Sequence, residues 1–153
     1  MYLSNNFTLQ ELTRSTTAIR KGINNIPHGE QVGNLRRLAI NILQSVRDMF
    51  GPTTINSGYR CKKLNKAVKG DRRSYHIRGM AADIESAGDA SLMELLVWIH
   101  ENCEFTELIA EYFPSGWVHV AYDPDNLCKT LKLKDKNHNY KKISLEYLRT
   151  LYG

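Results

Sequence analysis

Two histidines and an aspartate are the residues of this chain whose types and spacing best suit chemistry. His76 lies in a polar segment, and Asp83 lies on the strand expected directly after it. Gly79 lets the chain turn sharply between them, and Ala81, on the same strand face as Asp83, leaves room beside the carboxylate. His119 is expected in mid-strand among apolar neighbours, where an unpartnered imidazole would be costly. Two histidines and one carboxylate are the ligand set of an open catalytic zinc site, with water in the fourth position.

Glu111 is a candidate general base if its strand brings it to the same place. A Pro-Ser-Gly sequence (114–116) joins this strand to the His119 strand. A three-residue loop with a left-handed glycine pairs Glu111 with His119 on one side of the sheet, whereas a two-residue turn pairs Tyr112 with His119. The glycine at the last loop position favours the first register. Beside a metal-bound water Glu111 would act as general base; alternatively, it would orient the His119 ring.

Arg60 ends a Ser-Gly-Tyr-Arg sequence that follows a short expected strand. Loops at such places often carry binding groups. The guanidinium could hold a substrate carboxylate through two parallel hydrogen bonds. The alternative is an arginine that simply remains in solvent, which is the usual state of an arginine after a turn.

Hydrophobic periodicity predicts the elements that must position these residues. Thr8 and Glu11 form a capping box at the start of an entry helix, and apolar residues recur at helical spacing from Gly29 to Phe50. One or two helical turns are expected in 61–68. A second amphipathic helix covers 92–102, and the expected strands are 53–59, 80–86, 105–113 and 117–122.

The order of these elements predicts one α+β domain over residues 1–153. N-terminal helices come first and pack on a small antiparallel sheet that one helix interrupts. The core spans about 7–122. Residues 123–153 form a basic C-terminal extension, weakly patterned until a short helix near 144–151.

Composition limits the class of partner without identifying it. Hydrophobic residues make up 42% of the chain, which excludes wholesale disorder, and 21 Lys and Arg against 16 Asp and Glu give a net charge of +5. This charge favours an anionic partner. The basic residues are scattered and match no nucleic-acid-reading motif, so no nucleic acid partner is expected. No apolar run approaches the ~18 residues of a membrane span, and we expect a monomer.

The cysteines and the N-terminal sequence indicate the compartment of synthesis. Cys61, Cys103 and Cys128 are odd in number, widely spaced and without a C-x-x-C pair, which indicates reduced thiols rather than a disulfide frame or a thiolate zinc site. The first residues carry no standard secretion signal. We therefore expect a protein made in the cytoplasm.

Five segments together resemble the M15 metallopeptidases, the zinc D-Ala-D-Ala carboxypeptidase family, and most closely its small branch common in phage genomes. The segments are FTLQELTRS, NLRRLAINILQSVRDMFG, INSGYRCKKLN, SYHIRGMAADIE and ELIAEYFPSGWVHVAY, and they span residues 7 to about 122. The combination of S-x-H-x-x-G-x-A-x-D with a later W-V-H-V is more specific than any of its parts. The resemblance implies the hedgehog/D-Ala-D-Ala-peptidase-like fold.

The resemblance also implies roles for five residues. His76, Asp83 and His119 would be the ligands of Zn²⁺. Arg60 would steady the substrate or its carboxylate, and Ser74 would support the loop beside His76.

The catalytic carboxylate implied by the resemblance is Glu111. Some branches of the family place the acidic base three residues before the last histidine, and here that position is Gly116. Glu111 therefore stands ahead of Asp123 and Glu107 as the candidate.

The implied activity is zinc-dependent hydrolysis of a peptide bond in the stem peptides of peptidoglycan. A D-Ala-D-Ala carboxypeptidase and a cell-wall endopeptidase of endolysin type would use the same metal site, so both remain open. The alternative is a non-catalytic module that binds the cell wall with the same fold. Without a secretion signal, the protein would reach the bacterial cell wall by phage lysis or as part of a virion.

Overall fold

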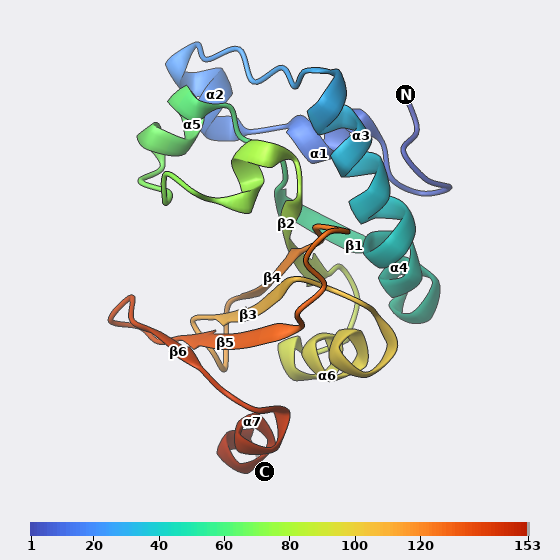
Figure 1. Ribbon diagram of the computed structural model, residues 1–153, viewed down its shortest axis with the longest axis vertical. Helices are drawn as coiled ribbons and strands as arrows, with labels where there is room; N and C mark the ends of the chain where they lie inside the picture. The colour runs from blue at the N-terminus through green and yellow to red at the C-terminus, as the bar shows by residue number, and fades with distance from the viewer. Residues whose placement is uncertain (153) are drawn as a thin grey trace.

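A six-stranded sheet crosses the molecule in the computed structural model, which describes residues 1–152 (Figure 1). Its strand order is β1-β2-β4-β3-β5-β6. The helical elements are α1 (Leu9–Thr13), α2 (Thr16–Lys21), α3 (Gly29–Leu38), the π-helical η1 (Ala39–Leu43), α4 (Gln44–Phe50), α5 (Lys62–Ala67), the 3₁₀ turn η2 (Tyr75–Arg78), α6 (Leu92–Asn102) and α7 (Leu145–Tyr152). The strands are β1 (Thr53–Ser57), β2 (Ala81–Ser86), β3 (Glu107–Glu111), β4 (Trp117–Ala121), β5 (Thr130–Lys134) and β6 (Tyr140–Lys142).

The predicted N-terminal helices are confirmed, with two additions. The capping box of Thr8 and Glu11 starts α1, but this helix ends at its C-cap, Arg14. Ser15 then caps the start of a second helix, α2. The long helix from Gly29 to Phe50 is continuous and contains a π-helical stretch in its middle. Its apolar stripe is fully buried in the core, which explains the helical spacing of these residues in the sequence: Leu35, Leu38, Ala39, Ile42, Leu43 and Val46.

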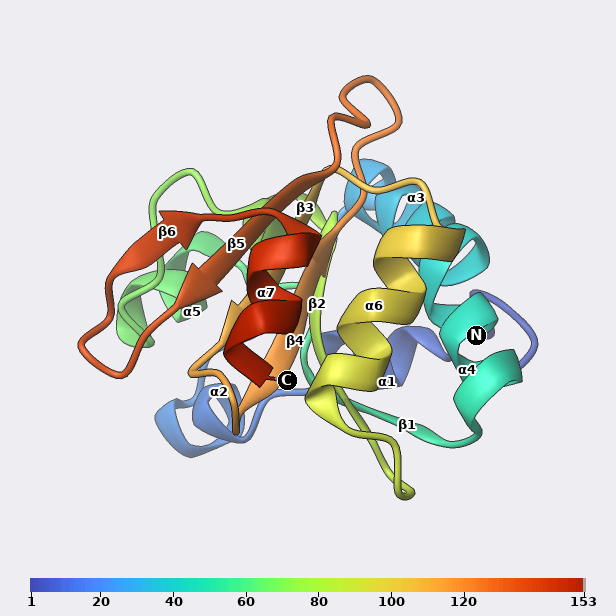
Figure 2. The ribbon, with the colours of Figure 1, turned by 90° about the horizontal axis from the view of Figure 1, so that it is seen from below.

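The two faces of the sheet have different partners. Helices α6 and α7 lie side by side on one face (Figure 2), and the long helix from Gly29 to Phe50 packs beside α6 in the same apolar core, where Phe50 contacts Trp98. The elements α2, α5 and η2 lie on the side of the opposite face. The face under α6 is apolar and includes Leu108, Ala110, Val118 and Val120, none of them exposed. Because side chains alternate along a strand, the intervening residues share the opposite face. That face carries the candidate site.

The α+β class is confirmed, but the sheet is larger than predicted and only mostly antiparallel. Residues 123–153, predicted as a weakly patterned extension, contribute β5, which runs parallel to β3, and β6. The physical reason is the alternation in β5, where Leu131 and Leu133 pack into the core while Lys132 and Lys134 take the opposite face. Gly153 lies outside the described residues.

Both predicted registers of the β3–β4 hairpin are wrong. Glu111 pairs with Trp117, and the residue opposite His119 is Ile109. The connection has five residues, 112–116, with Tyr112 and Gly116 at positive φ and a cis peptide bond before Pro114. The favoured register, which paired Glu111 with His119, is wrong by two residues, an offset that preserves the alternation of faces. Glu111 therefore still shares a sheet face with His119, but it lies two residues along β3 from Ile109, the residue directly opposite His119.

Two smaller expectations concern membranes and thiols. Within residues 1–152, no helix combines the length and the apolar character required to cross a bilayer. The three cysteines are free thiols, and Cys103 is the buried one.

Candidate active site

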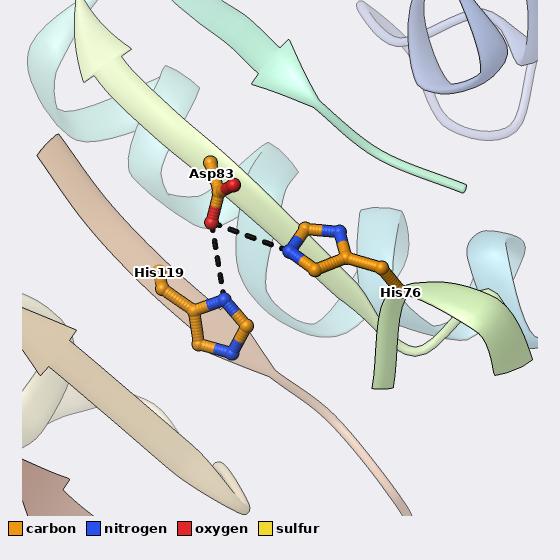
Figure 3. Close-up of side chains that lie close together, drawn as sticks. All are labelled: His76, Asp83 and His119. Carbon is orange, nitrogen blue, oxygen red and sulfur yellow. Dashed lines mark hydrogen bonds and ion pairs between the residues drawn. The ribbon is translucent and has the colours of Figure 1, made fainter. Parts of the chain in front are cut away.

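His76, Asp83 and His119 converge in a buried cluster on the sheet face opposite α6 (Figure 3). Asp83 Oδ1 lies 3.4 Å from His76 Nε2 and 3.0 Å from His119 Nδ1. One ligand atom from each residue lies within 4.8 Å of the others. Asp83 and His119 are directly paired across β2 and β4. The sheet therefore sets two of the three positions, and the chain before β2 supplies the third.

The turn that carries His76 is built as the local sequence suggests. Ser74 caps the 3₁₀ turn η2, and its Oγ accepts a hydrogen bond from the backbone N–H of His76 at 3.2 Å. Gly79 ends the turn in the left-handed conformation, with φ +70°. Ser74 thus supports the backbone of His76.

The ring of His76 is oriented from behind by the backbone of Gly58. His76 Nδ1 lies 2.7 Å from the Gly58 carbonyl oxygen, which can only accept, so Nδ1 carries the proton. Burial lowers the pKa of His76, which favours the neutral ring. The lone pair is therefore on Nε2, the nitrogen that faces Asp83.

His119 is held between two carboxylates. Its Nδ1 contacts Asp83, and its Nε2 lies 3.1 Å from Glu107 Oε1. Burial by itself would lower the pKa of His119, but the hydrogen bonds to Asp83 and Glu107 raise it to about 9. Burial would likewise raise the pKa of Asp83, but the two histidines hold it well below its usual range. A cation that binds through Nδ1 must displace a proton from this ring.

Arg60 contacts the cluster through Asp83. Its Nη2 lies 3.5 Å from Asp83 Oδ2, and its Nε donates to Ser57 Oγ at 3.0 Å. Nη1 donates to Asn65 Oδ1 at 2.9 Å. Although burial lowers the pKa of Arg60, an arginine stays protonated at neutral pH. The guanidinium is thus a fixed positive charge beside the cluster and not a solvated side chain.

Glu111 is a buried carboxylate that faces the same cleft. It is 6% exposed, and among the described residues its Oε2 finds no hydrogen-bond partner. The nearest opposite charge is Lys134 Nζ, 3.5 Å from Oε2. Burial raises the pKa of Glu111 although Lys134 and His119 act to lower it. Such a group suits proton transfer, because its basicity lies closer to neutral pH than that of an ordinary glutamate.

The other two carboxylates considered from the sequence have different surroundings. Glu107 is committed to His119 Nε2 and Lys132; although burial acts to raise its pKa, these partners lower it to about 2. The carboxylate of Asp123 pairs with Arg78 and accepts a hydrogen bond from the backbone N–H of Asp125, and Asp123 does not line the cleft. The position that we considered for Glu111, as the residue that orients the His119 ring, belongs to Glu107.

A cleft of about 560 Å³ opens onto the cluster. Arg60, Ser74, Glu107 and Glu111 line it together with the three clustered residues, so the six residues assigned to the site from the sequence, and Glu107, lie in one place, while Asp123 lies outside it. The extension adds Lys132, Lys134 and Tyr140 to this lining. Sequence reasoning missed these three, although the alternation TLKLK (130–134) is a signal of a strand with one basic face.

The cluster fits a divalent metal ion with an open coordination position. It offers two imidazole nitrogens and a carboxylate oxygen, all buried. The second nitrogen of each ring is occupied by another group, Gly58 O for His76 and Glu107 for His119. Metal-binding histidines are typically oriented in this way.

A comparison with protein-family models matches residues 5–121 to the family described as Peptidase M15. The chain belongs to the peptidase M15 family. The members of this family are metallopeptidases, and membership implies a peptidase. A comparison with curated proteins finds no match.

The family match and the cleft do not end at the same residue. The matched region contains His76, Asp83, Glu111 and His119, and it ends at the last residue of β4. Strands β5 and β6 lie beyond it, yet they contribute to the lining of the cleft. The site of this M15 peptidase therefore includes a part that its family pattern does not cover.

Proposed function

We propose that this M15 peptidase is a zinc enzyme that hydrolyses peptide bonds in the stem peptides of peptidoglycan. The observation that carries the proposal is the convergence of His76, Asp83 and His119 beside a buried carboxylate, Glu111, in one cleft of a metallopeptidase-family chain. Membership of the family supports the reaction type. The substrate is inferred from the resemblance to D-Ala-D-Ala peptidases and from the charge chemistry described below.

His76 Nε2, Asp83 and His119 Nδ1 would hold the zinc ion. When bound, Zn²⁺ supplies Lewis-acid chemistry, polarising the scissile carbonyl and lowering the pKa of water towards ~7. Asp83 also contacts Arg60, so its carboxylate is oriented by three partners before any metal arrives. Such a preset geometry reduces the reorganisation required on binding.

Glu111 would transfer the proton in the hydrolysis. In the proposed step its carboxylate takes a proton from the attacking water as the water oxygen bonds to the scissile carbonyl carbon. The same proton passes to the departing amine nitrogen as the C–N bond breaks, which regenerates the carboxylate. The buried Oε2, which accepts no hydrogen bond from the described residues, and the raised pKa of Glu111 support this role.

Arg60 would bind the substrate, and Ser74 would support the turn that carries His76. The guanidinium of Arg60 faces the cleft as a fixed positive charge, which suits a substrate carboxylate. Stem peptides that contain D-amino acids offer such a group. Ser74 would keep His76 and the cleft wall in place through its backbone contact. The net charge of +5 is compatible with an anionic cell wall.

The place of action in this proposal is the bacterial cell wall, which a monomer would reach through phage lysis or as a virion component. The metal, the substrate and this route are parts of the same hypothesis and have separate tests.

Digestion of purified peptidoglycan, followed by mass spectrometry of the products, tests the proposed activity. We expect new peptide termini with the wild-type protein and none with His119→Ala. Release of a terminal D-alanine would identify a carboxypeptidase, and cleavage within the stem would identify an endopeptidase.

Metal analysis of the purified protein accompanies the digestion, and near-stoichiometric zinc is expected. Wild-type and His119→Ala digests that cannot be distinguished would contradict the proposed activity. Cell-wall binding without cleavage would instead support the alternative of a binding module.

A further inference from the structure

The extension beyond the family match is joined to the site by backbone pairing as well as by side chains. Strand β5 runs parallel to β3, in a register that places Lys132 beside Ile109, the residue opposite His119. Hydrogen bonds hold the strand at both ends: Thr130 N donates to Thr106 O at 3.1 Å, and Tyr112 N donates to Lys134 O at 2.9 Å. The lysines of β5 are therefore kept at defined positions on the cleft face.

Lys132 makes a close ion pair with one of the two glutamates of β3. Its Nζ donates to Glu107 Oε2 at 2.9 Å. The other oxygen of this carboxylate, Oε1, contacts His119 Nε2 at 3.1 Å. Each oxygen of Glu107 thus has its own partner, and the two contacts together define the plane of the carboxylate.

These contacts extend to the His76–Asp83–His119 cluster. On the far side of its ring, His119 Nδ1 contacts Asp83 Oδ1 at 3.0 Å. A series of charge-assisted contacts therefore runs from Lys132 through Glu107 and His119 to Asp83. Without the lysine, the Glu107 side chain would be free to rotate towards solvent, and the ring would lose a fixed orientation.

We propose that Lys132 is a positioning residue of the metal centre, which acts through Glu107 on the ring of His119. The C-terminal extension is then a working part of the active site and not an appendage of it. This inference rests on the proposed function only in that the His-Asp-His cluster binds a metal ion. Lys132 makes no contact with the cluster except through Glu107 among the described residues.

Metal affinity, measured by competition of Zn²⁺ between the protein and a chromophoric chelator, tests this role. We expect Lys132→Met to weaken zinc binding by about tenfold, as is common for the loss of an outer-shell partner. Lys132→Arg should retain most of the wild-type zinc affinity because it keeps the positive charge. The matched control is Lys136→Met in the exposed turn between β5 and β6, which should bind zinc like the wild type.

A double-mutant cycle separates positioning from a general structural role. In a Glu107→Gln background, Lys132→Met should have almost no further effect on zinc affinity, since its route to His119 has already been removed. The visible absorption bands of the Co²⁺-substituted protein should shift in the same direction in Lys132→Met and in Glu107→Gln, because both substitutions alter the orientation of the same ligand, His119.

Each outcome decides the inference. Wild-type zinc affinity in Lys132→Met would overturn it, and so would equal effects of the substitution with and without Glu107. Should Lys132→Met fail to fold, Lys132→Arg and Glu107→Gln carry the test: an unchanged Co²⁺ spectrum in Glu107→Gln would overturn the inference. A wild-type protein that binds no metal would instead defeat the proposed function.

Discussion

The carbonyl oxygen of Gly58 and the Nδ1 of His76 lie 2.7 Å apart, so the backbone of one loop determines which nitrogen of the ring is free for a metal. Gly58 is also packed against the backbone of α1: a Cβ at this position would collide with the Leu12 carbonyl group. The close approach is required because Tyr59 N donates to Leu12 O at 2.7 Å. A residue without a side chain therefore positions a candidate ligand through its backbone carbonyl.

Gly58→Ala should consequently damage both stability and metal binding. The added methyl group must displace either α1 or the Gly58 carbonyl, and we expect a loss of about 1–3 kcal/mol in the free energy of unfolding, as for an overpacked core. Zinc affinity should fall by about 10-fold or more as the orientation of His76 is lost. Chemical denaturation and chelator competition measure the two effects.

Gly33→Ala is the matched control for this substitution. Gly33 lies inside α3 with room for a methyl group, so alanine should raise stability by about 0.5–1 kcal/mol and leave zinc affinity unchanged. If Gly58→Ala bound zinc as tightly as Gly33→Ala, the carbonyl of Gly58 would not orient His76.

Metal removal should lower thermal stability. Only the folded chain brings the three ligand atoms within 4.8 Å of one another, so zinc should bind the native state selectively. At a free zinc concentration 100 times the Kd, the native state gains about 2.7 kcal/mol. The Tm should fall on chelation and recover when Zn²⁺ is added back.

The matched variants for metal removal are His76→Ala and His28→Ala. His28 is an exposed residue before α3, outside the cluster, and its variant should respond to the chelator as the wild type does. His76→Ala should lose most of the zinc-dependent part of its stability. An equal zinc response in the two variants would remove His76 from the ligand set.

The pH dependence of hydrolysis should report the environment of Glu111. Among the groups that line the cleft, Lys134, His119, Asp83, Arg60 and Tyr140 interact electrostatically with Glu111. Burial raises the pKa of Glu111 above the ordinary 4.5. A general base works when deprotonated, so kcat/KM should rise with pH through this raised pKa, and the acid limb should lie above pH 4.5.

Two substitutions test the assignment of this limb. Lys134 lowers the pKa of Glu111, so Lys134→Met should move the acid limb to higher pH. Glu111→Gln should reduce kcat by about 10²–10⁴-fold while zinc affinity is retained. An acid limb that stays in place in Lys134→Met would assign it to a different group.

The extension should also contribute to the stability of the fold. Leu131 of β5 is 3% exposed within the core, and Leu131→Ala should cost about 2–5 kcal/mol in the free energy of unfolding. Leu151 of α7 is 49% exposed, and the same substitution there should cost less than about 0.5 kcal/mol. Equal effects at the two positions would show that β5 does not belong to the common core.

Local sequence patterns were sufficient for much of the fold and for the cluster residues. The helical period from Gly29 to Phe50 predicted the long helix, because a stripe of buried residues requires that spacing. Ser74, His76, Gly79 and Asp83 lie within ten consecutive residues, and their spacing alone describes a capped turn followed by a strand. Short-range geometry of this kind is accessible from sequence.

Long-range pairing is what the sequence left open. Both registers considered for the hairpin failed because Tyr112 adopts a positive φ and the connection takes five residues, which no local rule favoured. The register decides which glutamate meets the His119 ring, and it selects Glu107 instead of Glu111. The partner of Glu107 in turn is Lys132, 25 residues later in the chain, on strand β5, which pairs in parallel with β3.

The sequence by itself therefore determined which residues form the candidate metal cluster, since the spacing around His76 and Asp83 and the strand around His119 are local properties. Only the tertiary structure decided the division of labour between Glu107 and Glu111, and only it brought the lysines of β5 to both of them. The physical reason is that contacts across a sheet depend on register and strand order. These are set by the packing of the whole core rather than by the residues that make the contact.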